Sequence, residues 1–273
     1  MSTSRKYTRE LRKQFGYFAT WLPGTPIALG DIGVMKKNVF TKIANLEDFG
    51  ISFVEEPDLD RSDIEHSSSG AVSVTTKASG NLSPAGSQVA EADAGIIVEF
   101  SKKNAILFKA TGTLSPSIKD QITLGKQILE LYRQGRWDKD WTVVTEVVTA
   151  RSATIIISIS AGGKIELKAK GDLGIAQLDI ADDNFELGVN YSKDLSTTII
   201  AKEGLTPLFK GSKIKTPFLG GPVFKMNNKV RSLALQQNGV AAMDIITPAL
   251  ANEQPDLLFF GEQEPDAEEE ELV

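Results

Sequence analysis

The chain lacks cysteine altogether and has a single histidine in 273 residues. Disulfides, thiolate metal sites, cysteine nucleophiles and cysteine-linked lipids are therefore excluded. Any Ser-His-Asp triad would have to use His66, yet no Gly-x-Ser-x-Gly motif presents a serine for it. Glycine-rich phosphate-binding motifs are missing as well. These absences predict a protein that is not an enzyme and that carries no cofactor and no metal.

Long apolar runs are also missing. No stretch approaches the roughly 18–20 apolar residues of a transmembrane helix, and the N-terminus lacks the apolar core of a signal peptide. We therefore expect a cytoplasmic protein. The sequence has only four tyrosines and three tryptophans, and its lysines and arginines are scattered. A stacking surface for single-stranded nucleic acid is therefore not expected.

The net charge of −6 is unevenly distributed. Residues 253–273 hold nine acidic side chains and no Lys or Arg, whereas the rest of the chain has 30 basic and 27 acidic residues. We predict a weakly basic body over residues 1–250 and an acidic tail over residues 251–273, which attract each other. The alternative is a disordered, solubilising tail. One apolar segment, which a purely solvating tail does not need, supplies the candidate autoinhibitory residues Leu257, Leu258, Phe259 and Phe260.

The sharpest pattern lies between Trp141 and Lys170. Residues 141–149 are mostly β-branched, which is typical of a half-buried strand, and residues 152–160 alternate with a period of two. Gly162-Gly163 is typical of a two-residue hairpin turn, and residues 164–170 alternate again. The sequence predicts a hairpin with one apolar and one polar face. Its apolar face would contain Ile155, Ile157, Ile159, Ile165 and Leu167.

Two interpretations of this hairpin stay open. It is either an antiparallel ribbon in a soluble sheet, with its apolar face on the core, or a ribbon that crosses a membrane. A membrane-crossing strand needs about 9–11 alternating residues with one face toward lipid, and both arms come close to that length. The lysines of the polar face suit water in the first case and a wet lumen in the second.

Two helices are expected. The first covers residues 5–22, with apolar residues at helical spacing up to Leu22, and ends at the Pro-Gly pair that follows. Its other side is basic and suits either an anionic membrane surface or packing on its own domain. The second helix starts from a Ser-Pro pair at residue 115 and ends at Gly135. The basic candidates for contact with a membrane surface are Arg5, Lys6, Arg9, Arg12 and Lys13.

A further ribbon precedes the second helix. Residues 67–93 are dominated by Ser, Gly, Ala, Thr and Val, and a strand of such small residues packs weakly. Segments 96–100 and 105–109 then indicate an apolar hairpin. Together these elements predict an α+β fold, with a twisted and mostly antiparallel sheet and two ribbons. The candidate membrane-inserting residues of this ribbon are Val72, Val74, Ile96, Val98, Ile106 and Phe108.

The order of these features is similar to that of the pore-forming domain of gasdermins. The sequence match is short, confined to Arg133-Gln134-Gly135 and Val143-Val144-Thr145-Glu146-Val147, while order and composition agree over about residues 7–200. The resemblance implies a body held inactive by a C-terminal segment, released by proteolysis, and assembling through membrane-spanning hairpins from residues 67–110 and 152–170. Bacterial gasdermins are this short and use a tail as the restraint. Some of them carry a lipidated N-terminal cysteine, which this chain lacks.

The sequence therefore favours a self-assembling, membrane-permeabilising effector that is triggered by cleavage near residues 240–262. Every backbone group in lipid must be paired, which a ribbon achieves only in a closed ring of strands from many copies, so assembly requires a removable restraint. The expected partners are further copies of the chain, an activating protease and an anionic membrane, with no nucleic acid. The main alternative is a soluble, non-enzymatic β-rich protein that binds a ligand or partner. A third reading is a hydrolase whose site has no recognisable motif.

Overall fold

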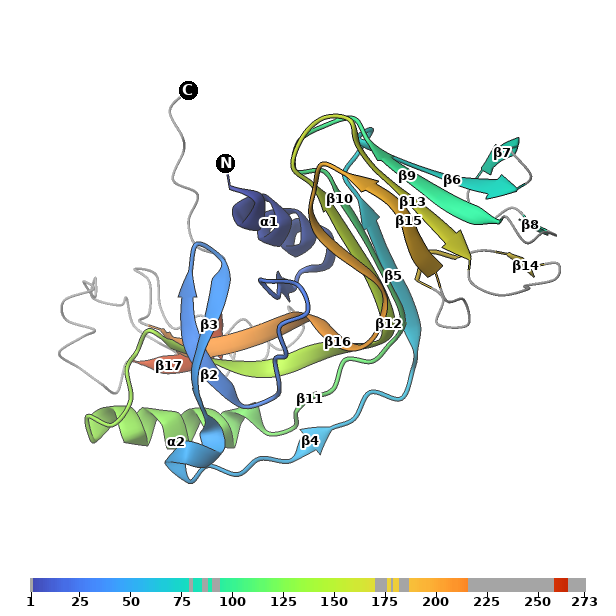
Figure 1. The fold of residues 1–273 in the computed structure, drawn as a ribbon. Helices are drawn as coiled ribbons and strands as arrows, with labels where there is room; N and C mark the ends of the chain where they lie inside the picture. The colour runs from blue at the N-terminus through green and yellow to red at the C-terminus, as the bar shows by residue number, and fades with distance from the viewer. Residues whose placement is uncertain are drawn as a thin grey trace, which may run out of the picture.

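The computed structural model has an α+β fold dominated by antiparallel strands, which confirms the predicted fold class (Figure 1). In the part of the chain that the structure describes, two α-helices and one short 3₁₀ helix accompany the sheets. The residues that the structure describes are 2–78, 81–84, 88–89, 94–169, 176–177, 179–181, 187–215 and 258–264.

The first helix, α1 (Thr3–Phe15), begins and ends at clear capping residues. The Ser2 side chain accepts a hydrogen bond from the Arg5 backbone N–H, and Gly16 closes the helix in the left-handed conformation. The helix is therefore shorter than the predicted span of residues 5–22. The chain turns after Gly16 into a strand at Phe18, and Leu22 is exposed rather than packed on a helical face.

The second helix, α2 (Gln121–Arg133), starts later than the sequence predicted. Asp120 caps it, and its side chain accepts a hydrogen bond from the Thr123 N–H. The Ser-Pro pair does not start the helix, because Ser117 and Ile118 pair with neighbouring strands. The 3₁₀ helix η1 (Leu46–Phe49) packs near α2 through their shared apolar cluster. No helix in the described part of the chain is long and apolar enough to cross a membrane.

Most strands belong to one large sheet, called the main sheet here. The described residues place ten strands in it: β1 (Phe18–Ala19), β2 (Asp31–Lys36), β3 (Val39–Asn45), β4 (Glu55–Glu56), β5 (Ser62–Ser67), β10 (Ile106–Thr113), β11 (Ser117–Ile118), β12 (Trp141–Ser158), β16 (Leu195–Lys215) and β17 (Phe259–Glu262). Its long path has the order β1, β16, β12, β10, β5. The long strands β12 and β16 curve strongly (Figure 1), because register shifts and the left-handed residues Ala201 and Gly204 bend the ribbon that they form.

A second sheet, the outer sheet, continues four strands of the main sheet. Its strands in spatial order are β15 (Leu187–Lys193), β13 (Gly163–Ala169), β9 (Gly95–Phe100), β6 (Val72–Ala78) and β7 (Asn81–Pro84). The short strands β8 (Gln88–Val89) and β14 (Ala176–Gln177) pair with each other. In the chain, β5 leads into β6, β9 into β10, β12 into β13 and β15 into β16. Every one of these steps passes from one sheet to the other.

This topology corrects two predictions. Segments 96–100 and 105–109 form strands but not a hairpin, because β9 pairs with β6 and β13 whereas β10 pairs with β5 and β12. Residues 152–170 likewise do not form a hairpin at Gly162-Gly163, because β12 and β13 lie in different sheets. In the outer sheet, the antiparallel partners are instead β6 with β9 and β13 with β15.

The main sheet is covered on both faces. Between the two sheets lies the inner core, which includes Val98, Phe100, Leu107, Ile156 and Leu167. On the opposite face, α1 covers a second cluster, the helix core, which includes Tyr7, Leu11, Phe108, Ile155 and Ile157. Figure 1 shows this helix against β10 and away from the outer sheet. The strand segment 152–158 is consequently buried on both sides. The prediction of one apolar and one polar, water-facing side is wrong for this segment: Ser152, Thr154 and Ser158 are all fully buried.

Candidate functional site

The region where the two sheets join is called the crease here. It consists of the four strand crossings: residues 68–71, 101–105 and 159–162, and Asp194. Backbone hydrogen bonds close it, among them Asn104 N to Ser158 O at 3.0 Å and Gly162 N to Phe100 O at 2.8 Å. The crease thus folds four paired strands over at one line, which is the feature that distinguishes this architecture from a flat ribbon.

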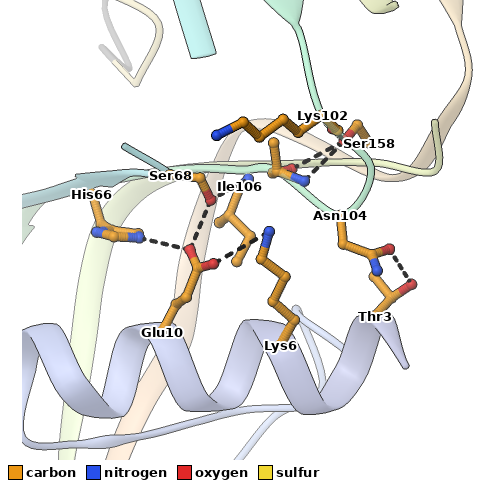
Figure 2. Close-up of polar contacts among 10 residues, drawn as sticks. Thr3, Lys6, Glu10, His66, Ser68, Lys102, Asn104, Ile106 and Ser158 are labelled. Atoms are coloured by element: carbon orange, nitrogen blue, oxygen red, sulfur yellow. Dashed lines mark hydrogen bonds and ion pairs between the residues drawn. The ribbon is translucent and has the colours of Figure 1, made fainter. Parts of the chain in front are cut away.

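Two buried serines fix the crease from inside. The Ser158 hydroxyl donates to the Lys102 carbonyl at 2.8 Å and accepts from the Ala105 N–H at 2.9 Å. The Ser68 hydroxyl accepts from the Ile106 N–H at 3.0 Å and donates to a Glu10 carboxylate oxygen at 2.7 Å (Figure 2). Backbone groups at the bend, which the strand ladders leave unpaired, gain partners in this way.

Glu10 connects α1 to this bend. Figure 2 shows its carboxylate between Ser68, His66 and Lys6, with the His66 Nε2 at 3.2 Å and the Lys6 Nζ at 3.4 Å. Burial by itself raises the pKa of Glu10, but the hydrogen bonds with His66 and Ser68 and the charge of Lys6 outweigh it and lower that pKa to about 2. At the start of the helix, the Thr3 hydroxyl donates to the Asn104 side chain at 2.9 Å.

Apolar contacts hold the same helix on the main sheet. Tyr7 and Leu11 are fully buried and share the helix core with Phe108, Ile155 and other residues of β10 and β12. Burial of side chains of this size contributes about 1.5–3 kcal/mol each. The helix α1 therefore covers the crease and the adjoining parts of β10 and β12. It has to move away before this face of the main sheet can contact another surface.

A half-buried polar cluster anchors the chain just after α1. The Tyr17 hydroxyl donates to the Glu146 carboxylate, and the Lys210 Nζ lies 3.0 Å from the same carboxylate and 4.4 Å from the centre of the Tyr17 ring. Burial and the Glu146 charge raise the pKa of Tyr17. The cluster ties α1 to β12 and β16 in addition to the apolar contacts.

The described part of the tail is a strand on the body. β17 pairs antiparallel with the last residues of β16, from Lys215 opposite Phe259 to Ser212 opposite Glu262. Leu258 is 6% exposed in a core of residues from α2 and the main sheet, and Phe260 packs against that core. The Gln263 N–H donates to the Gly211 carbonyl at 2.6 Å. Leu257, the fourth predicted tail residue, lies outside the described residues.

A glycine within α2 makes room for this strand. A Cβ atom on Gly125 would lie 2.9 Å from Phe260 Cβ and 3.3 Å from Phe260 Cδ1. Glycine in a helix interior costs about 0.5–1 kcal/mol relative to alanine, and nothing in α2 itself requires the missing side chain. The close approach of Phe260 accounts for the glycine at this position.

Charges of opposite sign accompany the apolar contacts of the tail. The Arg12 Nη2 lies 3.4 Å from Glu262 Oε1, and the Lys215 Nζ lies 2.9 Å from Glu264 Oε1. Both carboxylates are exposed, so each pair contributes little by itself. Arg12 nevertheless connects the basic face of α1 directly to the acidic tail.

The five predicted basic residues do not form one open patch. Arg9 and Lys13 are exposed, whereas Arg5, Lys6 and Arg12 are half-buried. Lys6 pairs with Glu10, and the Arg12 guanidinium also lies 4.3 Å above the Phe18 ring. In this state only part of the predicted membrane-contacting surface faces solvent.

The predicted membrane-inserting residues are divided between two cores. Val72, Val74, Ile96, Val98, Ile165 and Leu167 belong to or pack against the inner core, and Ile106, Phe108, Ile155 and Ile157 belong to the helix core. Ile159 lies in the crease and is 45% exposed. The predicted apolar face of residues 152–170 is therefore split between the two cores in this folded form, and the insertion of these side chains into a membrane stays a prediction.

Sequence reasoning missed the polar residues that fix the crease. Glu10, Ser68 and Asn104 lie far apart in the sequence and no local pattern marks them, whereas Ser158 carried a signal only as a polar residue in an apolar strand. Among the residues that the structure describes, no group of His, Asp and Glu is arranged to hold a metal ion.

No protein-family model and no curated protein sequence matches the chain. Among solved structures, the chain is similar to a bacterial gasdermin from Bradyrhizobium tropiciagri, with 13% identity and a TM-score of 0.33, over 79% of this chain and 90% of that one. A likeness of this size carries no argument about function, which has to rest on the residues of the chain itself.

Proposed function

We propose that the protein is a non-enzymatic, membrane-permeabilising effector whose tail strand restrains it until proteolysis. It rests in the cytoplasm, and on release its creased strands straighten, insert into an anionic membrane and assemble with further copies. The single observation that carries this proposal is the distribution of apolar residues along the strands that cross the crease.

In each of the two central strands, the apolar residues on the two sides of the crease keep the same parity: they are all at even positions in one strand and all at odd positions in the other. Alternate residues of a strand share a face. The inner-core residues Ile96, Val98 and Phe100 occupy even positions, as do the helix-core residues Ile106, Phe108 and Ala110. Ile165, Leu167 and Ala169 occupy odd positions, as do Ala153, Ile155 and Ile157. If the crease straightened, both cores would become one face of one ribbon.

The register of the central strands supports the same conclusion. β10 and β12 pair with Ile106 opposite Ile157, and β9 and β13 pair with Phe100 opposite Gly163. The crease between these rungs therefore holds equal lengths of the two strands, residues 101–105 and 158–162. Straightening would extend one ladder into the other without any change of partner. The combined rows span residues 96–110 and 153–169, which exceeds the roughly 9–11 residues that cross a bilayer, and two polar residues, Lys102 and Asn104, interrupt the first row at the crease.

The opposite face of the straightened ribbon would be largely polar. It would carry Glu99, Lys109, Lys164, Glu166 and Lys168 together with Ser and Thr residues, and the large apolar exceptions would be Ile97, Leu107 and Ile156. A ribbon with one apolar and one charged face satisfies lipid on one side and water on the other. The two edge strands of the ribbon, β5 and β16, run in opposite directions, so neighbouring copies can continue the antiparallel ladder.

The tail strand supports the restraint. β17 covers part of the edge of β16, fills the groove beside Gly125 and reaches Arg12 of the helix that covers the crease. A strand that docks through an edge, two large apolar side chains and ion pairs can be removed by one cleavage of the segment before it. Loss of the tail would uncover apolar surface and remove Glu262 as a partner of Arg12.

The test compares two lysine substitutions on adjacent residues. A protease recognition sequence inserted after residue 250 allows cleavage of the full chain, and dye release from anionic vesicles is measured before and after cleavage. Ile159 is 45% exposed in the folded form, so Ile159→Lys is tolerated there but places a charge in the apolar row. Ser160→Lys adds the same charge to the polar face. We expect leakage only after cleavage, lost by about tenfold or more in Ile159→Lys and retained in Ser160→Lys.

Two results would contradict the proposal. Vesicles that stay intact with the cleaved, unsubstituted protein would exclude membrane permeabilisation. Equal leakage from both lysine variants would show that this row does not meet lipid, and the soluble binding protein would then be the better interpretation. A charge at Ile157 is not a suitable test, since that side chain is fully buried and its replacement would unfold the soluble form.

A further inference from the structure

We propose that four left-handed residues, one in each strand crossing, are the hinges that keep the ribbon folded at the crease. The consequence for leakage rests on the proposed function, whereas the role of the residues in the soluble fold does not. Gly70 has a φ of 60°, Asn104 of 56°, Gly162 of 84° and Asp194 of 56°. No other residue of the four crossings has a positive φ.

The residue types at these positions fit the conformation. A left-handed backbone is strained for ordinary L-residues, and glycine, asparagine and aspartate are the types that adopt it most readily. The four crossings differ in length, from the single residue 194 to residues 101–105, and they share no sequence motif. What they share is one residue of these three types in the left-handed region.

The left-handed residue also explains how the strand changes faces. Phe100 and Leu107 both pack in the inner core although their positions differ by an odd number, and the same holds for Ile156 and Ile165. A regular strand would put each of these pairs on opposite faces. A crossing with one left-handed residue interrupts the alternation, so the same apolar row faces α1 on one side of the crease and the inner core on the other. Restoring an extended backbone at the hinges would restore the single apolar face.

Two of the hinges can be tested through the backbone alone. A Cβ atom added to Gly70 or Gly162 would meet no atom within 4 Å, so alanine there fills no occupied space and acts only on the left-handed conformation. Gly135 offers a matched control, because it has a φ of 70°, equally open surroundings and a place after α2, outside the crease. Gly162→Ala and Gly135→Ala should therefore strain the folded chain to a similar extent but in different places.

The experiment is amide hydrogen exchange on the intact, uncleaved protein, without a membrane. We expect Gly162→Ala to raise the exchange rates of the crease amides of Asn104, Ser158 and Gly162 by roughly tenfold. Gly135→Ala should leave these rates unchanged, and the double variant Gly70→Ala with Gly162→Ala should raise them further. Unchanged crease exchange in Gly162→Ala, or an equal rise in Gly135→Ala, would overturn the hinge assignment.

Leakage after cleavage separates this inference from the proposed function. Gly162→Ala should release dye roughly tenfold faster than the unsubstituted cleaved protein, since part of the restraint on straightening is lost, and Gly135→Ala should not. Selective exchange at the crease without leakage from any cleaved form would support the hinges and refute the pore. Leakage that is slower in Gly162→Ala than in Gly135→Ala would refute the hinges even if the pore forms.

Discussion

Glu10 is the residue at which the covering helix and the crease meet. It is a partly buried carboxylate in an otherwise basic helix, and it has one partner on β5 (His66), one at the crease (Ser68) and one on its own helix (Lys6). Its folded-state pKa of about 2 lies below the ordinary glutamate value of about 4.3, so the folded chain binds fewer protons at this group than the unfolded chain does. Its stabilising contribution is therefore complete above roughly pH 5 and is lost as the pH falls toward 2.

We predict that Glu10→Gln lowers the free energy of unfolding at pH 7 by about 1–3 kcal/mol, the range for hydrogen bonds to charged groups. The difference from the unsubstituted protein should shrink between pH 5 and pH 2, because the unfolded chain takes up a proton at Glu10 over that range while the folded carboxylate stays ionised down to about pH 2. Urea unfolding at pH 7, 5 and 3 measures it. Glu47→Gln, at an exposed position, serves as the control. A difference for Glu10→Gln that stays constant down to pH 3 would show that the ionised Glu10 carboxylate does not stabilise the fold.

At the scale of the element, the tail strand is explained by a feature of the helix beneath it. Gly125 weakens α2 as an isolated helix and has a reason only when Phe260 lies on it. Leu258 and Phe260 were predicted from the sequence as docking residues, because an apolar segment stands out among nine acidic side chains. Their site was not predictable, because it combines α2, the edge of β16 and residues of the main sheet that are distant in sequence.

We predict that Gly125→Ala makes the uncleaved protein leak. The added methyl group would displace Phe260 and loosen the tail, while alanine stabilises α2 itself by about 0.5–1 kcal/mol. Dye release by the uncleaved chain should rise toward the cleaved level without loss of thermal stability of the body. Gln127→Ala, on the exposed side of the same helix, should change neither quantity, and a Gly125→Ala protein that stays silent until cleavage would exclude this groove as the seat of the restraint.

The strands were easier to predict than their partners. Alternation located β6, β9, β10, β12 and β13 closely, because it depends only on local burial. It assigned hairpins to segments that cross between sheets, because a turn of Gly-Gly or Lys-Lys-Asn serves a tight hairpin and a crossing equally well. No local apolar pattern predicts β5 (Ser62–Ser67), the edge strand of the main sheet, because its residues are mostly polar.

At the scale of the whole molecule, the two sheets are one antiparallel ribbon folded over, and a straightened form would keep its pairing. The strand order β16, β12, β10, β5 in the main sheet corresponds to β15, β13, β9, β6 in the outer sheet. What the fold loses on straightening is the inner core, the cover of α1 and the contacts of residues 179–181 with the main sheet. Those contacts include hydrogen bonds from Thr154 to the Ile180 carbonyl at 2.5 Å and from Thr111 to the Ala181 carbonyl at 3.2 Å.

Two lysine–carboxylate ion pairs should respond differently if the crease straightens. Lys109 on β10 lies 2.5 Å from Asp179, which joins the two halves, whereas Lys164 lies 2.9 Å from Glu99 within the outer sheet. Lys109 pairs with Thr154 of β12, and Lys168 lies near the far end of β13. Thr154 and Lys168 are about 14 residues apart in the sequence, which is roughly 45 Å in an extended strand. Asp179 precedes Leu187, the partner of Ala169, by eight residues, so it can reach at most about 29 Å from that rung. Straightening must therefore separate Lys109 from Asp179, while Glu99 and Lys164 remain neighbours.

Because the chain has no cysteine, each pair can be replaced by two cysteines and joined by the same short, reducible bifunctional thiol reagent. We predict that the link between positions 109 and 179 abolishes leakage after cleavage and that reductant restores it. The link between positions 99 and 164 should leave leakage unchanged, because the ladder that it joins is present before and after straightening. Inhibition by both links would mean that strands exchange partners during insertion, and inhibition by neither would mean that the crease stays folded while the membrane is breached.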